Sequence, residues 1–138
     1  STPSTTDSNL VLAVFADDLN GNTLVAPNSR PYVKRVAMGE DPFASAPHWI
    51  VQWHHSTYYT TSAVLRDDYN FQVKLFDDGT IEYHYDTMLS STSSQYGCGA
   101  SAITWLENAT GTQALTINAL STNNPGISPR SAFRFVPR

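Results

Sequence analysis

Alternating apolar and polar positions are clearest between Tyr69 and Tyr85, where the sequence reads YNFQVKLFDDGTIEYHY. Two alternating runs flank Asp77-Asp78-Gly79, and this pattern predicts a β-hairpin. A two-residue Asp-Gly turn would mix apolar and polar side chains on each face. A three-residue loop, with Gly79 in the left-handed conformation at its last position, keeps the two faces separate. The predicted pairs are Leu75 with Ile81, Val73 with Tyr83 and Phe71 with Tyr85.

The other face of this hairpin is polar, and we expect it to lie mainly in solvent; it carries Gln72, Lys74, Glu82 and His84. The apolar face needs a cover, and other segments with strand patterns can supply one. These segments are residues 10–15, 32–38, 49–54, 102–106, 114–119 and 133–135. No stretch of helical period longer than about two turns separates them. The sequence therefore predicts an all-β fold, an antiparallel two-sheet β-sandwich of about eight strands.

No linker or change of composition divides the chain, so we expect one domain over residues 1–138. Residues 1–8 hold Ser, Thr, Pro and Asp without periodicity and should form a flexible lead-in. The apolar positions of the predicted strands should supply most of the core: Trp49, Val51, Trp53, Phe71, Val73, Leu75, Ile81, Tyr83, Leu115, Ile117, Phe133 and Phe135.

Composition favours an extracellular location, because charged residues make up only 14% of the chain while Ser, Thr and aromatic residues are abundant. The net charge of −4, without a basic cluster, argues against nucleic acid and anionic membrane surfaces as partners. No apolar run approaches the roughly 20 residues of a membrane span. No signal peptide is visible either, which indicates a mature or excised chain. We therefore expect a secreted or cell-surface protein.

The single cysteine, Cys98, cannot form a disulfide within the chain. A small, partly buried residue in a Gly-rich loop is the favoured interpretation. A bond to another chain or to a missing segment is the alternative. A nucleophilic role is disfavoured, because no recognisable motif connects Cys98 to any of the four histidines.

Carboxylates occur in adjacent pairs at Asp67-Asp68 and Asp77-Asp78, both at predicted turns. The sequence shows no Ser/His/Asp motif, phosphate loop or dinucleotide fingerprint. We therefore expect no catalytic residues and no enzymatic activity. The competing hypothesis is a glycan-processing enzyme that uses Asp67, Asp68 and His55. Such an enzyme would hold two carboxylates about 5 to 10 Å apart in a deep pocket.

Asp18, Asn20 and Asn22 have the spacing that opens a calcium-binding loop, in which one tight turn supplies several oxygen ligands. The rest of the loop does not follow this pattern. Thr23 stands where glycine is needed, and Ser29 stands where a bidentate glutamate is needed. A turn stabilised by its own side chains is therefore favoured, with calcium as the alternative and no other cofactor expected.

His54 and His55 are adjacent, so on a regular strand they would point to opposite faces and could share a metal only if the strand were bent. His48 and His84 have no spacing that would recruit them. A zinc site is therefore disfavoured. The sequence Asn108-Ala109-Thr110 is formally a glycosylation acceptor, but we favour a role for Asn108 in a turn.

The segment HHSTYY is the best candidate for ligand binding, through His54, His55, Tyr58 and Tyr59. It combines flat aromatic faces with hydrogen-bonding groups, which suits a sugar ring or a protein anchor. The alternative is that at least one of the two tyrosines folds back to cover the end of the core.

Four segments, taken in order, resemble the nidogen-type extracellular domain and its relatives in secreted bacterial proteins. They are LAVFADDLN (12–20), WIVQWHHSTYY (49–59), NFQVKLFDDGTIEYHY (70–85) and SAITWLENATGTQALTIN (101–118). Together they span nearly all of the chain. The resemblance implies an adhesion, matrix or accessory module, and it carries no catalytic residues.

The chain departs from that pattern in two places. It begins almost directly at the apolar run 10–15, where relatives have earlier strands, and it has Trp105-Leu106 where relatives often have Gly-Ile. The first departure suggests a fragment that lacks early strands, or an edge beside residues 10–15 that a partner fills. That partner would be a second copy or a separately made segment.

These observations lead to an expected function. The chain should be a non-catalytic extracellular recognition or adhesion module that binds a carbohydrate or a protein surface through the Tyr58-Tyr59 loop. The alternative is a structural module that packs within a larger secreted or surface assembly.

Overall fold

The computed structural model describes residues 10–20, 29–58, 67–89, 102–118 and 127–137. Within these ranges the chain forms β-strands and no helix, so no described helix could cross a membrane. The predicted lead-in, residues 1–8, lies outside the described residues. The strands are β1 (Leu12–Ala16), β2 (Leu19–Asn20), β3 (Arg30–Val36), β4 (His48–Tyr58), β5 (Asp68–Phe76), β6 (Ile81–Leu89), β7 (Ile103–Glu107), β8 (Ala114–Asn118) and β9 (Ser131–Phe135).

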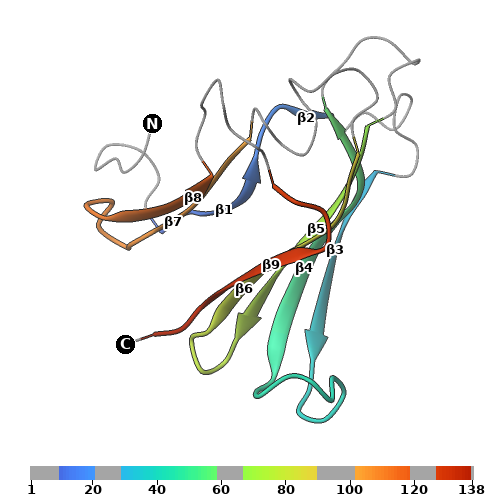
Figure 1. The fold of residues 1–138 in the computed structure, drawn as a ribbon. Helices are drawn as coiled ribbons and strands as arrows, with labels where there is room; N and C mark the ends of the chain where they lie inside the picture. Colours follow the sequence, from blue (N-terminus) through green and yellow to red (C-terminus); the bar gives the residue numbers. More distant parts are fainter. Residues whose placement is uncertain (1–9, 21–28, 59–66, 90–101, 119–126, 138) are drawn as a thin grey trace.

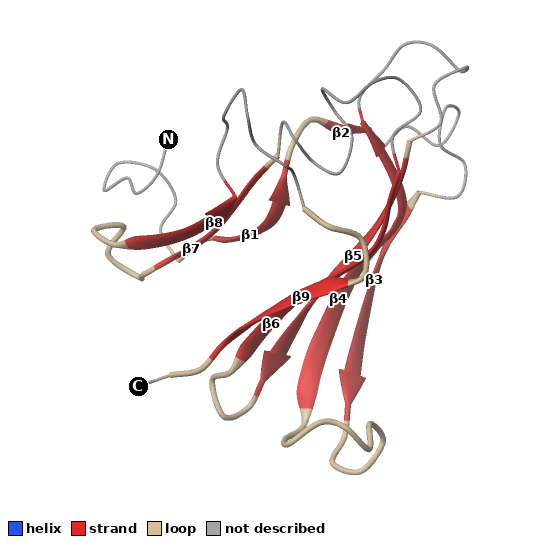
Figure 2. Ribbon diagram, viewed as in Figure 1, coloured by secondary structure: helices blue, strands red, loops and turns tan. Residues whose placement is uncertain are grey.

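The strands form two antiparallel sheets, as predicted (Figure 1). The large sheet has the order β2-β4-β5-β6-β9, and β3 pairs with β4 on the same side as β2. The small sheet has the order β1-β7-β8. The sheets meet near β1 and diverge toward the turn between β5 and β6 (Figure 2). At the diverging end, Ile81 of the large sheet and Leu12 and Leu106 of the small one line a space of about 810 Å³, whereas aromatic side chains pack the other end.

The hairpin of β5 and β6 has the predicted register. Leu75 lies opposite Ile81, and the pairs Val73–Tyr83 and Phe71–Tyr85 follow. The N–H of Phe76 donates to the carbonyl of Thr80 at 2.9 Å, which closes a loop of three residues. Gly79, the last of them, has a φ of 84°, the left-handed conformation that glycine adopts without steric strain.

Aromatic side chains from both sheets fill the tightly packed end. Phe15 of β1 contacts the rings of Tyr69 and Phe71 of β5, at centroid distances of 5.3 and 5.1 Å. The hydroxyl of Tyr85 donates to the carbonyl of Val14 at 2.5 Å. These contacts place β1 over β5 and β6. Burial removes the phenol of Tyr85 from water and raises its pKa.

The tyrosine two residues earlier joins the sheets in the same way. The hydroxyl of Tyr83 donates to the carbonyl of Trp105 at 3.0 Å, so β7 lies over β6. The Tyr83 side chain is fully buried, and desolvation raises its pKa. Each tyrosine thus combines apolar burial with a hydrogen bond between the sheets, and such a bond contributes about 1 kcal/mol.

The predicted core is correct in its centre and wrong at its margins. Phe71, Val73 and Tyr83 are buried, whereas Trp49, Leu115 and Phe133 are 47%, 54% and 36% exposed. Leu115 and Phe133 lie on the edge strands β8 and β9, and Trp49 lies near the start of β4, opposite Arg35 of β3. Val51, Trp53, Leu75, Ile81, Ile117 and Phe135 pack against the core while partly buried. Buried residues that the prediction did not include are Val14, Phe15, Tyr69, Tyr85, Met88, Ala102 and Ile127.

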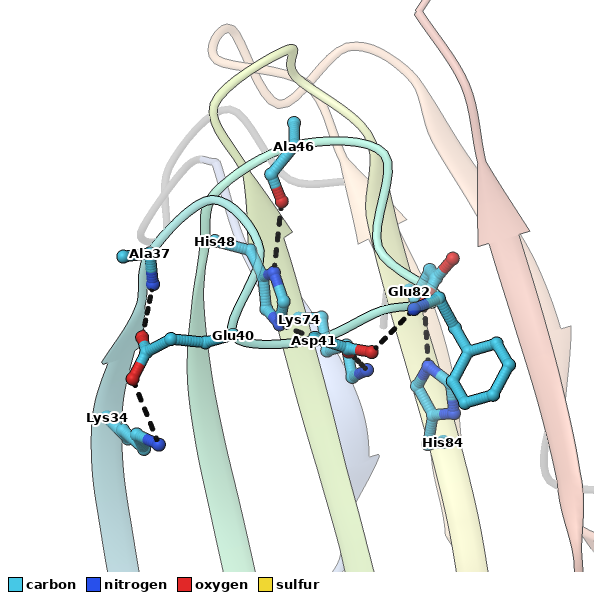
Figure 3. A network of polar contacts seen from close by, with 10 residues as sticks. Lys34, Ala37, Glu40, Asp41, Ala46, His48, Lys74, Glu82 and His84 are labelled. Atoms are coloured by element: carbon cyan, nitrogen blue, oxygen red, sulfur yellow. Dashed lines mark hydrogen bonds and ion pairs between the residues drawn. The ribbon is translucent and has the colours of Figure 1, made fainter.

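The polar face of the hairpin is partly covered rather than mainly in solvent (Figure 3). The loop after β3 folds over it, and Lys74 donates to the carboxylate of Asp41 at 3.0 Å. This hydrogen bond holds the pKa of Asp41 below its usual value. Glu82 contacts His84 at 2.8 Å and Arg134 at 3.6 Å. The part of this face next to the turn between β5 and β6 is therefore a network of paired charges, and the part nearer Asn70 is the open polar surface.

Candidate functional site

A polar groove crosses the large sheet on the face that points away from the small sheet. Its volume is about 640 Å³, and its residues come from β4, β5, β6 and the start of β9. We call it the Asn70 groove, after the residue at its centre. It is lined by Gln52, His54, His55, Asp68, Asn70, Phe71, Gln72, His84, Tyr85, Asp86, Thr87, Arg130, Ser131 and Ala132.

A β-bulge in β4 forms one side of the groove. Trp53 pairs with Phe71 and Ser56 pairs with Tyr69, so the two residues between Trp53 and Ser56 oppose Asn70 alone. These two residues are His54 and His55, and His55 adopts a φ of 51°, which is unusual for a residue other than glycine. The bulge turns both rings to the same side of the strand.

A second bulge lies on the other side of β5. Phe71 pairs with Tyr85 and Tyr69 pairs with Met88, so Asp86 and Thr87 also oppose the same single residue, Asn70. Bulges bend a sheet locally and change the direction of side chains, and they are common beside functional sites. Because both bulges lie opposite Asn70, the surface of the sheet is recessed there, and this recess is the groove.

Hydrogen bonds fix the centre of the groove. The backbone N–H of His55 donates to Oδ1 of Asn70 at 2.9 Å. Nδ2 of Asn70 donates to Oδ1 of Asp68 at 2.7 Å, and Nδ1 of His55 lies 2.8 Å from the same oxygen. A carboxylate only accepts hydrogen bonds, so Nδ1 of His55 carries the proton and Nε2 is the remaining polar atom of the ring. Asp68 is thereby held by two donors, and Asn70 joins two strands.

A row of side chains across the strands continues the groove. Gln52, Gln72, His84 and Ala132 lie side by side on β4, β5, β6 and β9. Ala132 has a small side chain, so the row projects least from the sheet at its β9 end. The ring of Tyr32 on β3 meets His54 edge-on, with a centroid distance of 6.0 Å, and about half of its surface is exposed. The groove thus combines amide, imidazole and carboxylate groups with a neighbouring aromatic ring.

Two of the four predicted ligand-binding residues lie in this groove, namely His54 and His55. Their rings do not point to opposite faces, because the bulge brings them together at a centroid distance of 4.0 Å. Tyr58 pairs through its backbone with Leu19, and its side chain lies outside the described residues. Tyr59 also lies outside them.

The residues weighed as metal ligands are only partly described. Asp18 donates its backbone N–H to the carboxylate of Asp17 at 2.9 Å, a bond typical of a turn. Asn20 forms part of β2, but its side chain and all of Asn22 lie outside the described residues. Among the residues with a described structure, no three His, Cys, Asp or Glu side chains lie close enough together to hold a metal ion.

Asn108 occupies the turn between β7 and β8, as favoured from the sequence. Its side-chain oxygen accepts from the N–H groups of Thr112 and Gln113, at 3.0 and 3.2 Å. Its Nδ2 donates to the hydroxyl of Thr112 at 3.2 Å. The side chain is therefore part of the turn. Cys98 falls outside the described residues.

The sequence analysis missed the centre of the site, although a signal for it exists. Alternation in β6 places Ile81, Tyr83 and Tyr85 on one face, and the next buried residue, Met88, follows after three positions instead of two. A break of this kind in a period-2 pattern indicates a bulge. Asp68 was named from the sequence together with His55, but only within the competing enzyme hypothesis, whereas Asn70, Gln72 and Arg130 were not identified as site residues because only the pairing of strands brings them together.

Comparison of the chain with protein-family models, curated proteins and solved structures finds no match. The functional assignment therefore rests on the geometry of the groove.

Proposed function

We propose that the chain is a non-catalytic extracellular recognition module that binds a carbohydrate in the Asn70 groove. The observation that carries this proposal is the hydrogen-bonded cluster of His55, Asp68 and Asn70 between two bulges. The resemblance to nidogen-type domains and the low content of charged residues support the extracellular location, which is part of the proposal.

The chemistry of the groove suits a sugar better than an apolar ligand or a protein hot spot. Sugar hydroxyls both donate and accept, and the amides of Gln52 and Gln72 offer both functions side by side. The volume of about 640 Å³ lies within the usual range for small-molecule sites. Protein hot spots instead gather buried aromatic anchors in their centres. The half-exposed ring of Tyr32 supplies a stacking face beside the polar groups.

Preorganisation adds to this argument. The carboxylate of Asp68 is already positioned by Asn70 and His55, so a ligand that bonds to it would not have to immobilise a free side chain. Ordering a rotamer-rich side chain at a binding site costs about 0.5 to 1.5 kcal/mol. A weak ligand such as a sugar gains most from a site in which this ordering has taken place on folding.

The test is a glycan array probed with the chain, followed by affinity measurements on any glycan that binds. Gln72→Ala removes one amide from the groove and should weaken binding about tenfold, or about 1.4 kcal/mol. The matched control is Gln113→Ala, the same change at an exposed position in the turn between β7 and β8. The free energy of unfolding of both variants should lie within about 0.5 kcal/mol of the parent's, because neither residue is in the core.

An array without reproducible binding would contradict the proposal. Equal losses in the Gln72→Ala and Gln113→Ala variants would place the ligand elsewhere on the surface. A blank array together with clear self-association in light scattering would favour the alternative function, a structural module within a larger assembly.

One observation supports the competing enzyme hypothesis, and another argues against it. Asp68 and His55 form a hydrogen-bonded pair in the groove, but Asp67 is not among the residues that line it. The second carboxylate at this site would be Asp86. If a bound glycan were cleaved during incubation, and if Asp68→Asn abolished the cleavage without abolishing binding, the chain would be a hydrolase rather than a binding module.

A further inference from the structure

One side chain from each of five strands lies in a single row on the outer face of the large sheet, the face that points away from the small sheet. Register places Tyr32 opposite Gln52, Gln52 opposite Gln72, Gln72 opposite His84 and His84 opposite Ala132. We call these five residues the cross-strand row. The last four line the Asn70 groove, and Tyr32 extends the row onto β3. Because neighbouring strands lie about 4.8 Å apart, the row is about 19 Å long.

Both ends of the row lie on edge strands of the large sheet (Figure 1). β9 is the last strand in the order of the sheet, and β3 is paired with β4 alone among the described strands. At the β9 end, Ala132 is exposed and has only a methyl group as its side chain. At the β3 end, Tyr32 is half-exposed. Within the part of the chain that the structure describes, a ligand that follows the row can therefore continue past the sheet in both directions.

Fixed side chains border the row on its two long sides. Toward the turn between β5 and β6, Lys74 and Glu82 lie opposite each other in the next row of the same face. Lys74 is held by Asp41 at 3.0 Å, and Glu82 is held by His84 at 2.8 Å (Figure 3). On the other side lies the hydrogen-bonded cluster around Asn70. The cross-strand row is thus the floor of an elongated site with rigid sides.

The floor of this site offers polar groups that are mostly uncharged. The amides of Gln52 and Gln72 both donate and accept, and the ring of Tyr32 adds a flat apolar face. A carboxylate only accepts, so Nε2 of His84 donates to Glu82, and Nδ1 is left to accept a hydrogen bond from a ligand. Hydroxyl groups repeated along a neutral chain match such a floor, because each strand presents one side chain to them.

We propose that the Asn70 groove binds the interior of a neutral, linear polysaccharide with β-1,4 linkages, which lies across the strands along the cross-strand row. This inference rests on the carbohydrate-binding function proposed above and specifies its ligand. An extended β-1,4-linked chain advances with each sugar by a distance close to the spacing between strands, so each strand meets about one sugar unit. An α-1,4-linked chain coils instead and leaves the row. A chain end is not needed, because the row is open at both ends.

The test is calorimetric titration with soluble β-1,4-linked gluco-, xylo- and manno-oligosaccharides of about two to six units. At least one series should bind, and its affinity should rise with length up to about five units and then stay constant, because five strands contribute to the row. The soluble polysaccharide of that series should bind with the same affinity per site as the pentasaccharide. α-1,4-linked gluco-oligosaccharides are the comparison, and they should gain no affinity with length.

Two substitutions separate the end of the row from its middle. Tyr32→Ala removes the stacking face at the β3 end and should weaken binding of the pentasaccharide about tenfold. It should leave binding of the trisaccharide nearly unchanged, because a short chain can occupy the strands from β4 to β6. Gln72→Ala acts in the middle and should weaken binding at every length. The matched control for Tyr32→Ala is Val33→Ala, a truncation on the opposite face of the same strand, and it should change none of these affinities.

Four results would overturn this inference. The first is an affinity that does not depend on chain length, and the second is binding of the oligosaccharides without binding of the polysaccharide, which would indicate recognition of a chain end. The third is an equal response of the Tyr32→Ala and Val33→Ala variants. The fourth is array binding confined to branched glycans, with no binding of the three β-1,4-linked series. All four leave the carbohydrate-binding function intact, whereas an array without any binding contradicts that function as well.

Discussion

The inner face of the large sheet has two halves with different surroundings. On β5 and β6, the covered half, Phe71, Val73 and Tyr83 are at most 4% exposed. On β3 and β4, the open half, Val33 and Trp49 are 65% and 47% exposed. Register places these side chains on one continuous face. In the open half this face also carries Arg35, whose guanidinium lies over the Trp49 ring at 5.7 Å from its centroid.

The two halves show that alternation identifies which side chains share a face, but not whether another sheet buries that face. Period-2 patterning follows from the geometry of a single strand, so it can be recognised locally. Whether the face is buried depends on which strands of the other sheet lie above it, and that depends on contacts distant in sequence. Phe15 and Phe71 are such a pair, and no local pattern connects them.

The largest difference in stability is expected when one aromatic residue is truncated in each half. Phe71→Ala removes a ring that stacks on Trp53 at 5.0 Å and contacts Phe15, and it should lower the free energy of unfolding by about 3 to 5 kcal/mol. Trp49→Ala removes a larger but half-exposed ring and should lower it by about 1 kcal/mol or less. Urea denaturation of both variants measures the two values. Equal losses would mean that the open half is in fact packed.

A second test uses the buried tyrosines of the covered half. Burial raises the pKa of Tyr83 and Tyr85 above the usual 10, so the folded state keeps these phenols protonated where the unfolded chain begins to lose protons. Their contribution to stability is complete below about pH 10 and is lost as the pH rises above it. The slope should reach at most about 1.4 kcal/mol per pH unit for each tyrosine.

Urea denaturation between about pH 8 and 11 measures this slope. The control is the double variant Tyr83→Phe/Tyr85→Phe, which keeps the rings and removes the ionisable groups. It should be less stable at neutral pH, because two hydrogen bonds between the sheets are lost, and its stability should fall less steeply above pH 10. Parallel slopes for parent and variant would show that the tyrosines are accessible to solvent in the folded state.

Sequence reasoning predicted the parts of the fold that local rules determine. The register of the β5–β6 hairpin, its three-residue loop and the left-handed Gly79 all follow from alternation and turn chemistry, and all are confirmed. The exposure of Trp49 was not predicted, because the width of the small sheet cannot be read from β4 itself. Met88 and Ile127 entered the core from segments without a clear strand pattern in the sequence.

The candidate site follows the same division. His54 and His55 could be selected from their chemistry, but their shared orientation required a bulge that depends on pairing with β5. Asn70 looked like an ordinary polar residue at the start of a hairpin. Its position opposite two bulges exists only once three strands are aligned.

The central claim, that one half of the inner face is covered and the other is open, is tested most directly by hydroxyl-radical footprinting of the isolated chain with mass spectrometry. The oxidation of side chains in the covered half and in the open half is then compared within one sample. We predict rapid oxidation of Trp49, together with protection of Phe71, Tyr83 and Tyr85 for as long as the chain stays folded. Protection of Trp49 equal to that of Phe71 would contradict the account, because the inner face of β4 would then be covered.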